Sequence, residues 1–185
     1  DTQDAKDLCD ALSYERRGNQ ILVGVHSADV SHYVKADTAL NADAAGRATS
    51  VYLVDITIPM LPEVLSNELF SLKPNVDRLA FSVFFSVTKE GVITGKEITK
   101  TVSHADRRFA YEDAQEVIEG KTDEKLATAI LFCNKVALKL KEQRCANGAI
   151  KCETPEVRFV LDESGKPIGL QTKVRKEAHK MIEEW

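Results

Sequence analysis

Residues 11–26 read ALSYERRGNQILVGVH, and this stretch contains the clearest structural signal in the chain. Its two ends, residues 11–15 and 20–26, have the composition of β-strands, and Gly18-Asn19 between them is typical of a tight hairpin turn. The second strand is apolar almost throughout, which predicts burial. We therefore expect an antiparallel hairpin that fixes the preceding segment against a sheet.

The segment before this hairpin, residues 1–11, reads DTQDAKDLCDA and is strongly acidic. Asp1, Asp4, Asp7 and Asp10 recur at every third residue, with Lys6 as the single lysine among them. On a helix, such like charges would repel by roughly 0.2–0.5 kcal/mol per pair. The cluster is typical either of a solvated acidic turn or of a cation site. Magnesium and manganese prefer carboxylate oxygens, and in such sites they promote phosphoryl transfer.

The blocks that follow carry a family resemblance. The pattern D-x-x-D-A-K-D-x-x-D-A-L-S is followed in order by GVHSADVSHYV, TSVYL, IPMLPEVLSNELFSLKPNVDRLAFSV, GAI, PEVRFVLDESGKPIG and KEAHKMIEEW. The chain resembles the catalytic domain of the ribonuclease II and ribonuclease R family, and ribonuclease R more than ribonuclease II. The resemblance runs from the first residue to the last. It implies a 3′-to-5′ hydrolytic exoribonuclease that degrades single-stranded RNA and releases nucleoside 5′-monophosphates.

The resemblance also implies the site. The four acidic positions of the family correspond to Asp1, Asp7, Cys9 and Asp10, of which the three aspartates would hold magnesium, with manganese as an alternative. Cys9 stands where the family has aspartate, and a thiol with a pKa of about 8.5 is a soft ligand that suits magnesium poorly. We expect Cys9 to impair turnover. The alternative function is a catalytically silent RNA-binding module or pseudoenzyme.

Four further residues are candidates for RNA binding. The resemblance places Tyr52 where the family has an aromatic ring that clamps RNA near its 3′ end, and the alternative is a half-buried strand tyrosine. Arg107 and Arg108 form a basic pair that contacts either phosphate or carboxylates. His32 completes the set, and near the C-terminus Glu177 and His179 are candidate residues of the RNA channel.

Two groups of polar residues admit both a structural and a functional interpretation. His26, Asp29 and His32 come soon after the hairpin, and we favour structural hydrogen bonding over a zinc site because no second ligand pair accompanies them. Ser66 and Ser71, with Asn67, would either bind phosphate or support the acidic segment. For Ser66 we favour a helix-capping role, with Leu69 and Phe70 in the core.

The remaining pattern alternates strands and helices. We expect helices at 37–47 (capped by Asp37 or Thr38), 66–72, 111–118, 123–143 and 173–185, an extended segment at 49–59, and hairpins at 78–103 and 157–171. This order predicts the α+β class, with a mainly antiparallel sheet and flanking helices. Residues 1–185 would form the N-terminal part of a single catalytic domain.

Composition limits the classes of protein. The 185 residues are 43% hydrophobic and 29% charged, which is typical of a globular protein. The formal net charge of −4 is opposite to that of a self-sufficient nucleic-acid binder, so RNA binding would be local, metal-mediated or supplied by other domains. The resemblance implies that the parts supplying this binding are the rest of the catalytic domain and OB-fold domains.

The sequence also gives expectations for the location of the protein and for the surface of its C-terminal region. No apolar run approaches ~20 residues and no signal peptide opens the chain, so we expect no membrane partner. The four cysteines form no C-x-x-C pair, which favours reduced thiols and a cytoplasmic location. The amphipathic pattern continues to the last residue, and we expect Met181, Ile182 and Trp185 to expose apolar surface.

Overall fold

The computed structural model describes residues 2–3, 5, 7–54, 56–122, 125–150, 157–172 and 174–185. The elements of this part of the chain are, in order, β1 (Asp10–Arg17), β2 (Gln20–Ala28), α1 (Val30–Tyr33), α2 (Ala39–Arg47), β3 (Val51–Tyr52), β4 (Thr57–Ile58), the π-helix η1 (Val64–Leu69), β5 (Asp77–Thr88), β6 (Ile93–His104), α3 (Tyr111–Ile118), α4 (Ala127–Ala146), β7 (Val157–Leu161), β8 (Pro167–Thr172) and α5 (Glu177–Glu184). Antiparallel sheets with flanking helices confirm the predicted α+β class.

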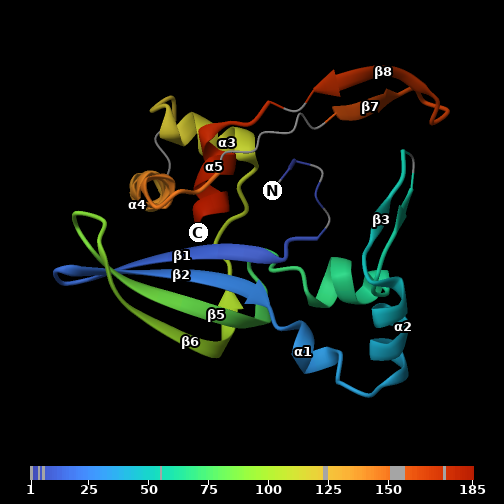
Figure 1. Ribbon diagram of the computed structural model, residues 1–185, viewed down its shortest axis with the longest axis horizontal. Coiled ribbons are helices and arrows are strands. Elements are labelled where there is room, and N and C mark those ends of the chain that lie inside the picture. The colour runs from blue at the N-terminus through green and yellow to red at the C-terminus, as the bar shows by residue number, and fades with distance from the viewer. Residues whose placement is uncertain are drawn as a thin grey trace.

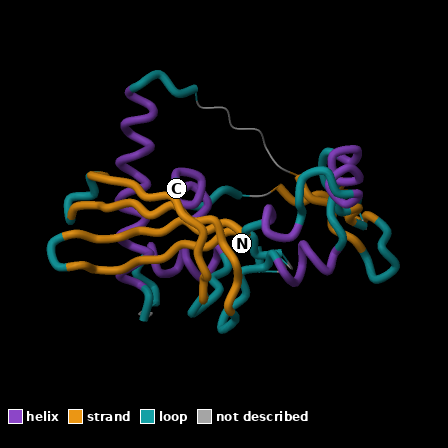
Figure 2. The backbone as a smooth tube through the Cα atoms, turned by 90° about the horizontal axis from the view of Figure 1, so that it is seen from below, coloured by secondary structure: helices purple, strands orange, loops and turns teal. Residues whose placement is uncertain are grey.

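The centre of the fold is a four-stranded antiparallel sheet in the order β1-β2-β5-β6. Figure 2 shows the four strands side by side. The predicted first hairpin is confirmed: Arg17 pairs with Gln20, and Gly18 adopts a φ of 61° that most residues avoid. The second hairpin, β5–β6, turns at Gly91, whose φ is 87°. The chain thus places β1, and the acidic segment that leads into it, at one edge of the sheet.

One face of this sheet is covered by α3, α4 and α5 (Figure 1). Alternate residues of β2 and β5 point to this face and pack against α4 and α5, because side chains alternate along a strand. The buried core consists of Ile21, Val23, Val87, Cys133, Val136, Ala137 and Met181. The apolar stripe predicted for residues 123–143 is therefore the face of α4 that packs on the sheet.

The last helix is docked by its apolar residues. Met181 is buried, and the Trp185 ring packs near Phe85 while its Nε1–H donates to the Cys133 carbonyl at 3.0 Å. The expectation that Met181 and Trp185 expose apolar surface was wrong, because both face α4 and the sheet. Ile182 remains exposed, as expected.

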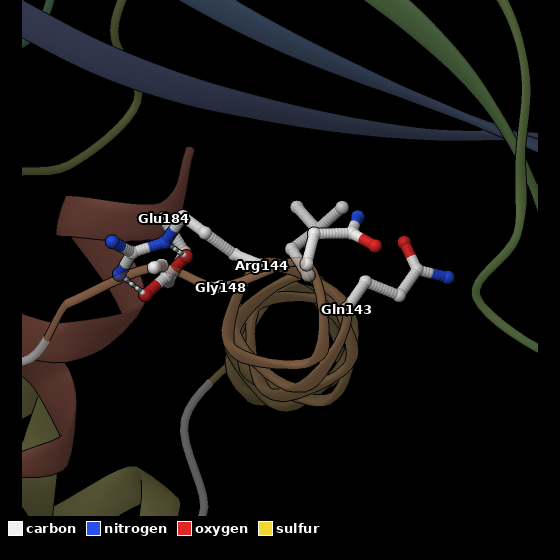
Figure 3. A pocket seen from close by; sticks show the side chains of 7 residues that line it. Gln143, Arg144, Gly148 and Glu184 are labelled. Atoms are coloured by element: carbon white, nitrogen blue, oxygen red, sulfur yellow. Dashed lines mark hydrogen bonds and ion pairs between the residues drawn. The ribbon is translucent and has the colours of Figure 1, made fainter.

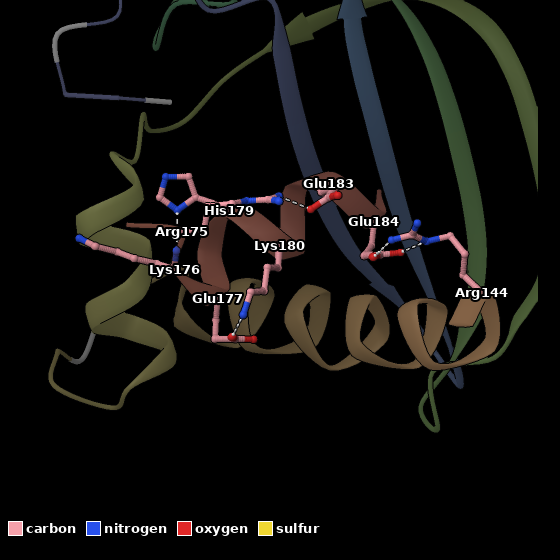
Figure 4. Close-up of polar contacts among 8 residues, drawn as sticks. All are labelled: Arg144, Arg175, Lys176, Glu177, His179, Lys180, Glu183 and Glu184. Atoms are coloured by element: carbon pink, nitrogen blue, oxygen red, sulfur yellow. Dashed lines mark hydrogen bonds and ion pairs between the residues drawn. The ribbon is translucent and has the colours of Figure 1, made fainter. Parts of the chain in front are cut away.

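Ion pairs along α5 add to this docking (Figure 4). Arg144 on α4 donates through two nitrogens to the Glu184 carboxylate, whose side chain is 5% exposed. Arg175 pairs with Glu183 on the same helix. The first of these pairs joins α5 to α4, and the second joins α5 to the residues that precede it.

The opposite face of the sheet contains a polar network that crosses all four strands. His26 on β2 bonds Ser13 on β1 through Nε2 (2.8 Å) and Ser82 on β5 through Nδ1 (2.7 Å), and Ser82 lies 2.6 Å from the Thr101 hydroxyl on β6. A Cβ atom at Gly24 would lie 2.4 Å from Ser13 Oγ, so glycine leaves the space that this network occupies. The structural interpretation of His26 is confirmed.

Asp29 and the helix α2 are also explained by local hydrogen bonds. The Asp29 carboxylate accepts from Ser31 Oγ at 2.6 Å and pairs with Lys100 at 2.8 Å, and these two contacts lower its pKa. Helix α2 begins after Thr38, whose Oγ1 accepts from the Asn41 N–H at 3.3 Å. Of the two predicted caps, the structure therefore selects Thr38.

Two predictions between residues 49 and 75 were wrong in detail. The predicted extended segment is a small hairpin, with β3 paired to β4, and Figure 1 shows it projecting from the body of the molecule. The predicted helical turn at 66–72 is instead the π-helix η1, which ends at Leu69. Ser66 lies inside η1 and does not cap it, because the helix already begins two residues after Pro62.

The third predicted hairpin is confirmed as β7–β8. Among the described residues, no helix is both long and apolar enough to cross a membrane.

Candidate active site at the acidic segment

The acidic segment comprises residues 1–10 and ends at the first residue of β1. Its described residues lie on the helical side of the sheet (Figure 1). Of its four aspartates, Asp7 and Asp10 belong to the described residues, whereas the predicted site residue Asp1 and its neighbour Asp4 lie outside them. The geometry of the candidate site is therefore that of residues 7–10 and the groups around them.

Leu8 anchors the segment. Its side chain is buried, its N–H donates to Ser71 Oγ at 3.1 Å, and its carbonyl accepts from the Leu72 N–H at 2.7 Å. The next residue is held as well, since the Cys9 carbonyl accepts from the Ala28 N–H at 3.0 Å. Of the two roles considered for Ser71, the structure shows support of the acidic segment.

This anchoring leaves the flanking side chains in solvent. Asp7 and Cys9 are exposed on either side of buried Leu8, and Asp10 is exposed at the start of β1. One Asp10 oxygen accepts from Ser27 Oγ at 2.8 Å, which orients the carboxylate. The segment thus presents two carboxylates and one thiol from a fixed backbone.

The thiol of Cys9 is a hydrogen-bond donor here. Its Sγ lies 3.7 Å from the second oxygen of Asp10. Desolvation raises the pKa of Cys9, and the negative charges of Asp10 and Asp7 raise it further. Because metals bind the thiolate, a thiol that stays protonated is a poor ligand. Asp7 and Asp10 fit a hard cation, but Cys9 does not.

An aromatic pair lies on the helical side of the segment. Tyr111, the first residue of α3, stacks on His179 of α5 with ring centroids 3.9 Å apart and planes 14° apart. Burial raises the pKa of Tyr111, and the negative charge of Asp10 raises it further. His179 is fixed by the Lys176 N–H, which donates to its Nδ1 at 3.2 Å (Figure 4).

The sequence analysis missed Tyr111, because a tyrosine at the start of a helix carries no chemical signal of its own. It named His179 as a candidate residue of the RNA channel, and that role stays a prediction. The structure shows the His179 ring stacked on Tyr111.

The basic pair divides between two roles. Arg108 Nη2 donates to the carbonyl oxygens of Thr2 and Gln3, each at 2.8 Å. Arg107 is exposed, and its guanidinium carbon lies 4.6 Å from the centroid of the Phe109 ring. Arg108 therefore donates to backbone carbonyls of the acidic segment, a role that neither of the predicted alternatives included.

The other two RNA-binding candidates are exposed. Tyr52, on the projecting β3–β4 hairpin, is 74% exposed, so its ring is open for stacking and is not the half-buried strand tyrosine of the alternative. His32 on α1 lies edge-on to Tyr33, which in turn contacts Phe70, the residue before Ser71. This contact connects α1 to the loop that anchors Leu8.

A hollow of the described surface lies elsewhere. It has a volume of about 620 Å³ and lies at the C-terminal end of α4, where Arg144 and Glu184 pair beside Gly148 (Figure 3). Its two charged groups neutralise each other, and none of its lining residues belongs to the acidic segment. Nor do the described residues include a group of three His, Cys, Asp or Glu side chains arranged to hold a metal. The candidate site is therefore an open surface.

Comparison with known proteins identifies the class. Residues 1–185 match the RNB domain. The chain belongs to the RNB family, which confirms the resemblance seen in its sequence blocks.

Individual relatives agree with this. The chain is 43% identical to DIS3-like exonuclease 2 of Schizosaccharomyces pombe and 41% identical to Ribonuclease R of Chlamydia trachomatis, in both cases over its whole length. It spans 22% and 27% of these two relatives. Among solved structures, Mycoplasma genitalium RNase R in complex with ribose-methylated single-stranded RNA superposes on the entire chain with a TM-score of 0.90 at 28% identity, and the chain covers 29% of it.

Proposed function

We propose that this chain is part of a 3′-to-5′ hydrolytic exoribonuclease that acts on single-stranded RNA and releases nucleoside 5′-monophosphates. The observation that supports this most is the acidic segment of an RNB family member, held by its backbone so that Asp7 and Asp10 face solvent on the two sides of buried Leu8. Exposed, oriented carboxylates are what a cation-dependent phosphodiester hydrolase requires.

A divalent metal is part of this proposal, since exoribonucleases of the RNB family generally depend on one. Magnesium takes one or two carboxylates from a protein together with water and substrate phosphate, and manganese accepts the same ligands. Asp7 and Asp10 would supply these oxygens, with Asp1 as the third residue implied by the resemblance. When bound, the metal would polarise the scissile phosphate and lower the pKa of the attacking water.

The remaining residues would handle the RNA. Tyr52 would stack on a base near the 3′ end, a contact that contributes about 1–3 kcal/mol per base and tolerates any sequence. His32 and Arg107, both exposed, would meet the sugar–phosphate backbone. Arg108 would act near the same strand, although its Nη2 donates to the acidic segment.

Cys9 supports a second candidate function. Because position 9 has a protonated thiol that donates to Asp10, the site has one carboxylate fewer than the four acidic positions of the family. A chain impaired in this way would bind RNA with little turnover. The two candidate functions use the same RNA-binding surface and differ in the rate of RNA hydrolysis.

We also propose that residues 1–185 are the N-terminal part of the catalytic domain, because the chain spans only 22% and 27% of the two curated relatives described above. The rest of that domain and OB-fold domains would supply further RNA contacts, and the protein would act in the cytoplasm.

The test uses the full-length protein that contains this chain. A 5′-labelled linear single-stranded RNA is compared with a circular RNA of the same sequence, with and without Mg²⁺. We expect nucleoside 5′-monophosphates from the linear RNA, shortening that starts at the 3′ end, and no product from the circle. The Asp10→Asn variant is the control for contaminating nuclease. Cleavage of the circular RNA at the rate of the linear one would contradict an exonuclease.

A further inference from the structure

Arg108 reaches the acidic segment from more than one hundred residues away in the sequence. One nitrogen, Nη2, donates at 2.8 Å to the carbonyls of two successive residues, Thr2 and Gln3. The Thr2 carbonyl also accepts from the Ala5 N–H at 3.1 Å. The guanidinium therefore joins Thr2 and Gln3, and through the Thr2 carbonyl also Ala5, to the body of the protein.

The other anchors of the segment lie further along the chain. Ser71 and Leu72 hold Leu8, and Ala28 holds Cys9. These contacts determine the path of residues 8–10 but begin several residues after Gln3. Arg108 supplies the matching long-range contact at the first half of the segment.

Arg108 is itself well placed for this role. It lies between the end of β6 and the start of α3, in a stretch that is fixed at both ends. On one side the Asn75 N–H donates to the Ala105 carbonyl at 2.8 Å, and on the other the Ala110 N–H donates to Asp113 at 3.2 Å. Because its backbone is held, the half-buried Arg108 side chain holds the acidic segment at a defined distance from α3.

Charge gives the contact a second effect. The acidic segment contains four aspartates in ten residues, and like charges so close together oppose an ordered path. A guanidinium cannot lose its proton in a protein, so Arg108 brings a permanent positive charge to this segment. Hydrogen bonds from a charged donor are also about twice as strong as neutral ones.

We propose that Arg108 is a positioning residue that sets where Thr2 and Gln3 lie relative to Asp7 and Asp10. Its consequence for catalysis rests on the proposed function, whereas the contact itself does not. The exposed Arg47, whose Nε donates to Asp43 at 2.9 Å within α2, is the control because it has the same charge on another element.

The first readout is amide hydrogen exchange in the protein that contains this chain. Arg108→Ala should speed exchange of the Ala5 amide roughly tenfold or more, because the carbonyl that it donates to loses its charged partner. Arg108→Lys should restore part of the protection, since an ammonium group also donates to carbonyls. Arg47→Ala should leave the amide unchanged. Equal exchange in the Arg108→Ala and Arg47→Ala variants would overturn the proposal.

The second readout separates positioning from simple stability. Binding of Mn²⁺ is followed by its electron paramagnetic resonance signal, and unfolding by urea in the same samples. We expect Arg108→Ala to weaken Mn²⁺ binding several-fold with little change in the unfolding midpoint, and Arg108→Lys to recover part of the affinity. Unchanged Mn²⁺ affinity in Arg108→Ala, when the unmodified protein binds the ion, would overturn positioning. If no version binds Mn²⁺ but Arg108→Ala still speeds exchange of the Ala5 amide, the proposed function is wrong and the positioning contact of Arg108 is supported.

Discussion

At the scale of single residues, Cys9 determines how much negative charge the acidic segment presents. Its carbonyl accepts from the Ala28 N–H, but its side chain donates to Asp10 instead of adding a third negative charge. The raised pKa of the thiol keeps it neutral near pH 7. The sequence was sufficient to identify this position as the departure from the family, while the contact with Asp10 became visible only in the structure.

His26 gives a prediction of pH dependence. Burial lowers its pKa, so in the folded protein the value lies below the ordinary pKa of about 6.5. Stability from neutral His26 is therefore fully present above about pH 6.5 and is lost as the pH falls through the window between the unfolded and folded pKa values. His26→Gln should lower the free energy of unfolding at pH 7.5 and flatten its decline toward pH 5.5, as measured by urea unfolding.

The exposed Thr94, which has no titratable side chain, supplies the control for this experiment. A Thr94→Ala variant should keep the pH dependence of the unmodified protein. Parallel stability curves for His26→Gln and the unmodified protein would show that His26 does not titrate on unfolding in this range.

At the scale of elements, the hairpins and the longer helices could be predicted, because their signals are local. Gly18-Asn19 marked the first turn, and the apolar stripe of α4 marked its buried face. The π-helix η1 could not be predicted in the same way. The Phe70 N–H donates to the Leu65 carbonyl five residues earlier, and Phe70 is buried against Tyr33, so long-range packing determines the wider turn.

The loop after η1 gives a prediction of stability. Ser71→Ala removes the acceptor of the buried Leu8 N–H, and an unsatisfied buried donor costs about 1–3 kcal/mol. Urea unfolding should show a loss of this size, and the Leu8 amide should exchange faster. Ser66→Ala is the matched control, because Ser66 contacts its neighbour Asn67 within η1 and its loss should stay within about 0.5 kcal/mol. Equal effects of the two substitutions would rule out Ser71 as the anchor of Leu8.

At the scale of the whole molecule, the candidate site is assembled from distant parts of the chain. The acidic segment is held by Ala28, by the loop at Ser71 and Leu72, and by Arg108, while Tyr111 and His179 lie on its helical side. None of these contacts is periodic or local, so the sequence pattern alone contained no signal for them. The family resemblance identified the carboxylates, but the groups that hold them in place required the structure.

The chain as a whole also explains the behaviour of its C-terminal region. The expected exposed apolar surface is largely absent, because Met181 and Trp185 complete the core formed by the sheet and α4. The amphipathic pattern of a helix indicates which of its side chains will be buried. It does not show whether the surface that buries them belongs to the same chain.

The most direct test of the central claim compares Cys9→Asp with the unmodified protein. Mg²⁺ is titrated into both, and release of nucleoside 5′-monophosphates from single-stranded RNA is followed in the same samples, with Cys145→Ser as the control for loss of a thiol. If the acidic segment is a cation site weakened at one position, Cys9→Asp should bind Mg²⁺ at least about tenfold more tightly and release nucleotides faster, since even changes around metal ligands shift affinity 10–100-fold. No gain in either quantity at saturating Mg²⁺ would contradict this account of the site.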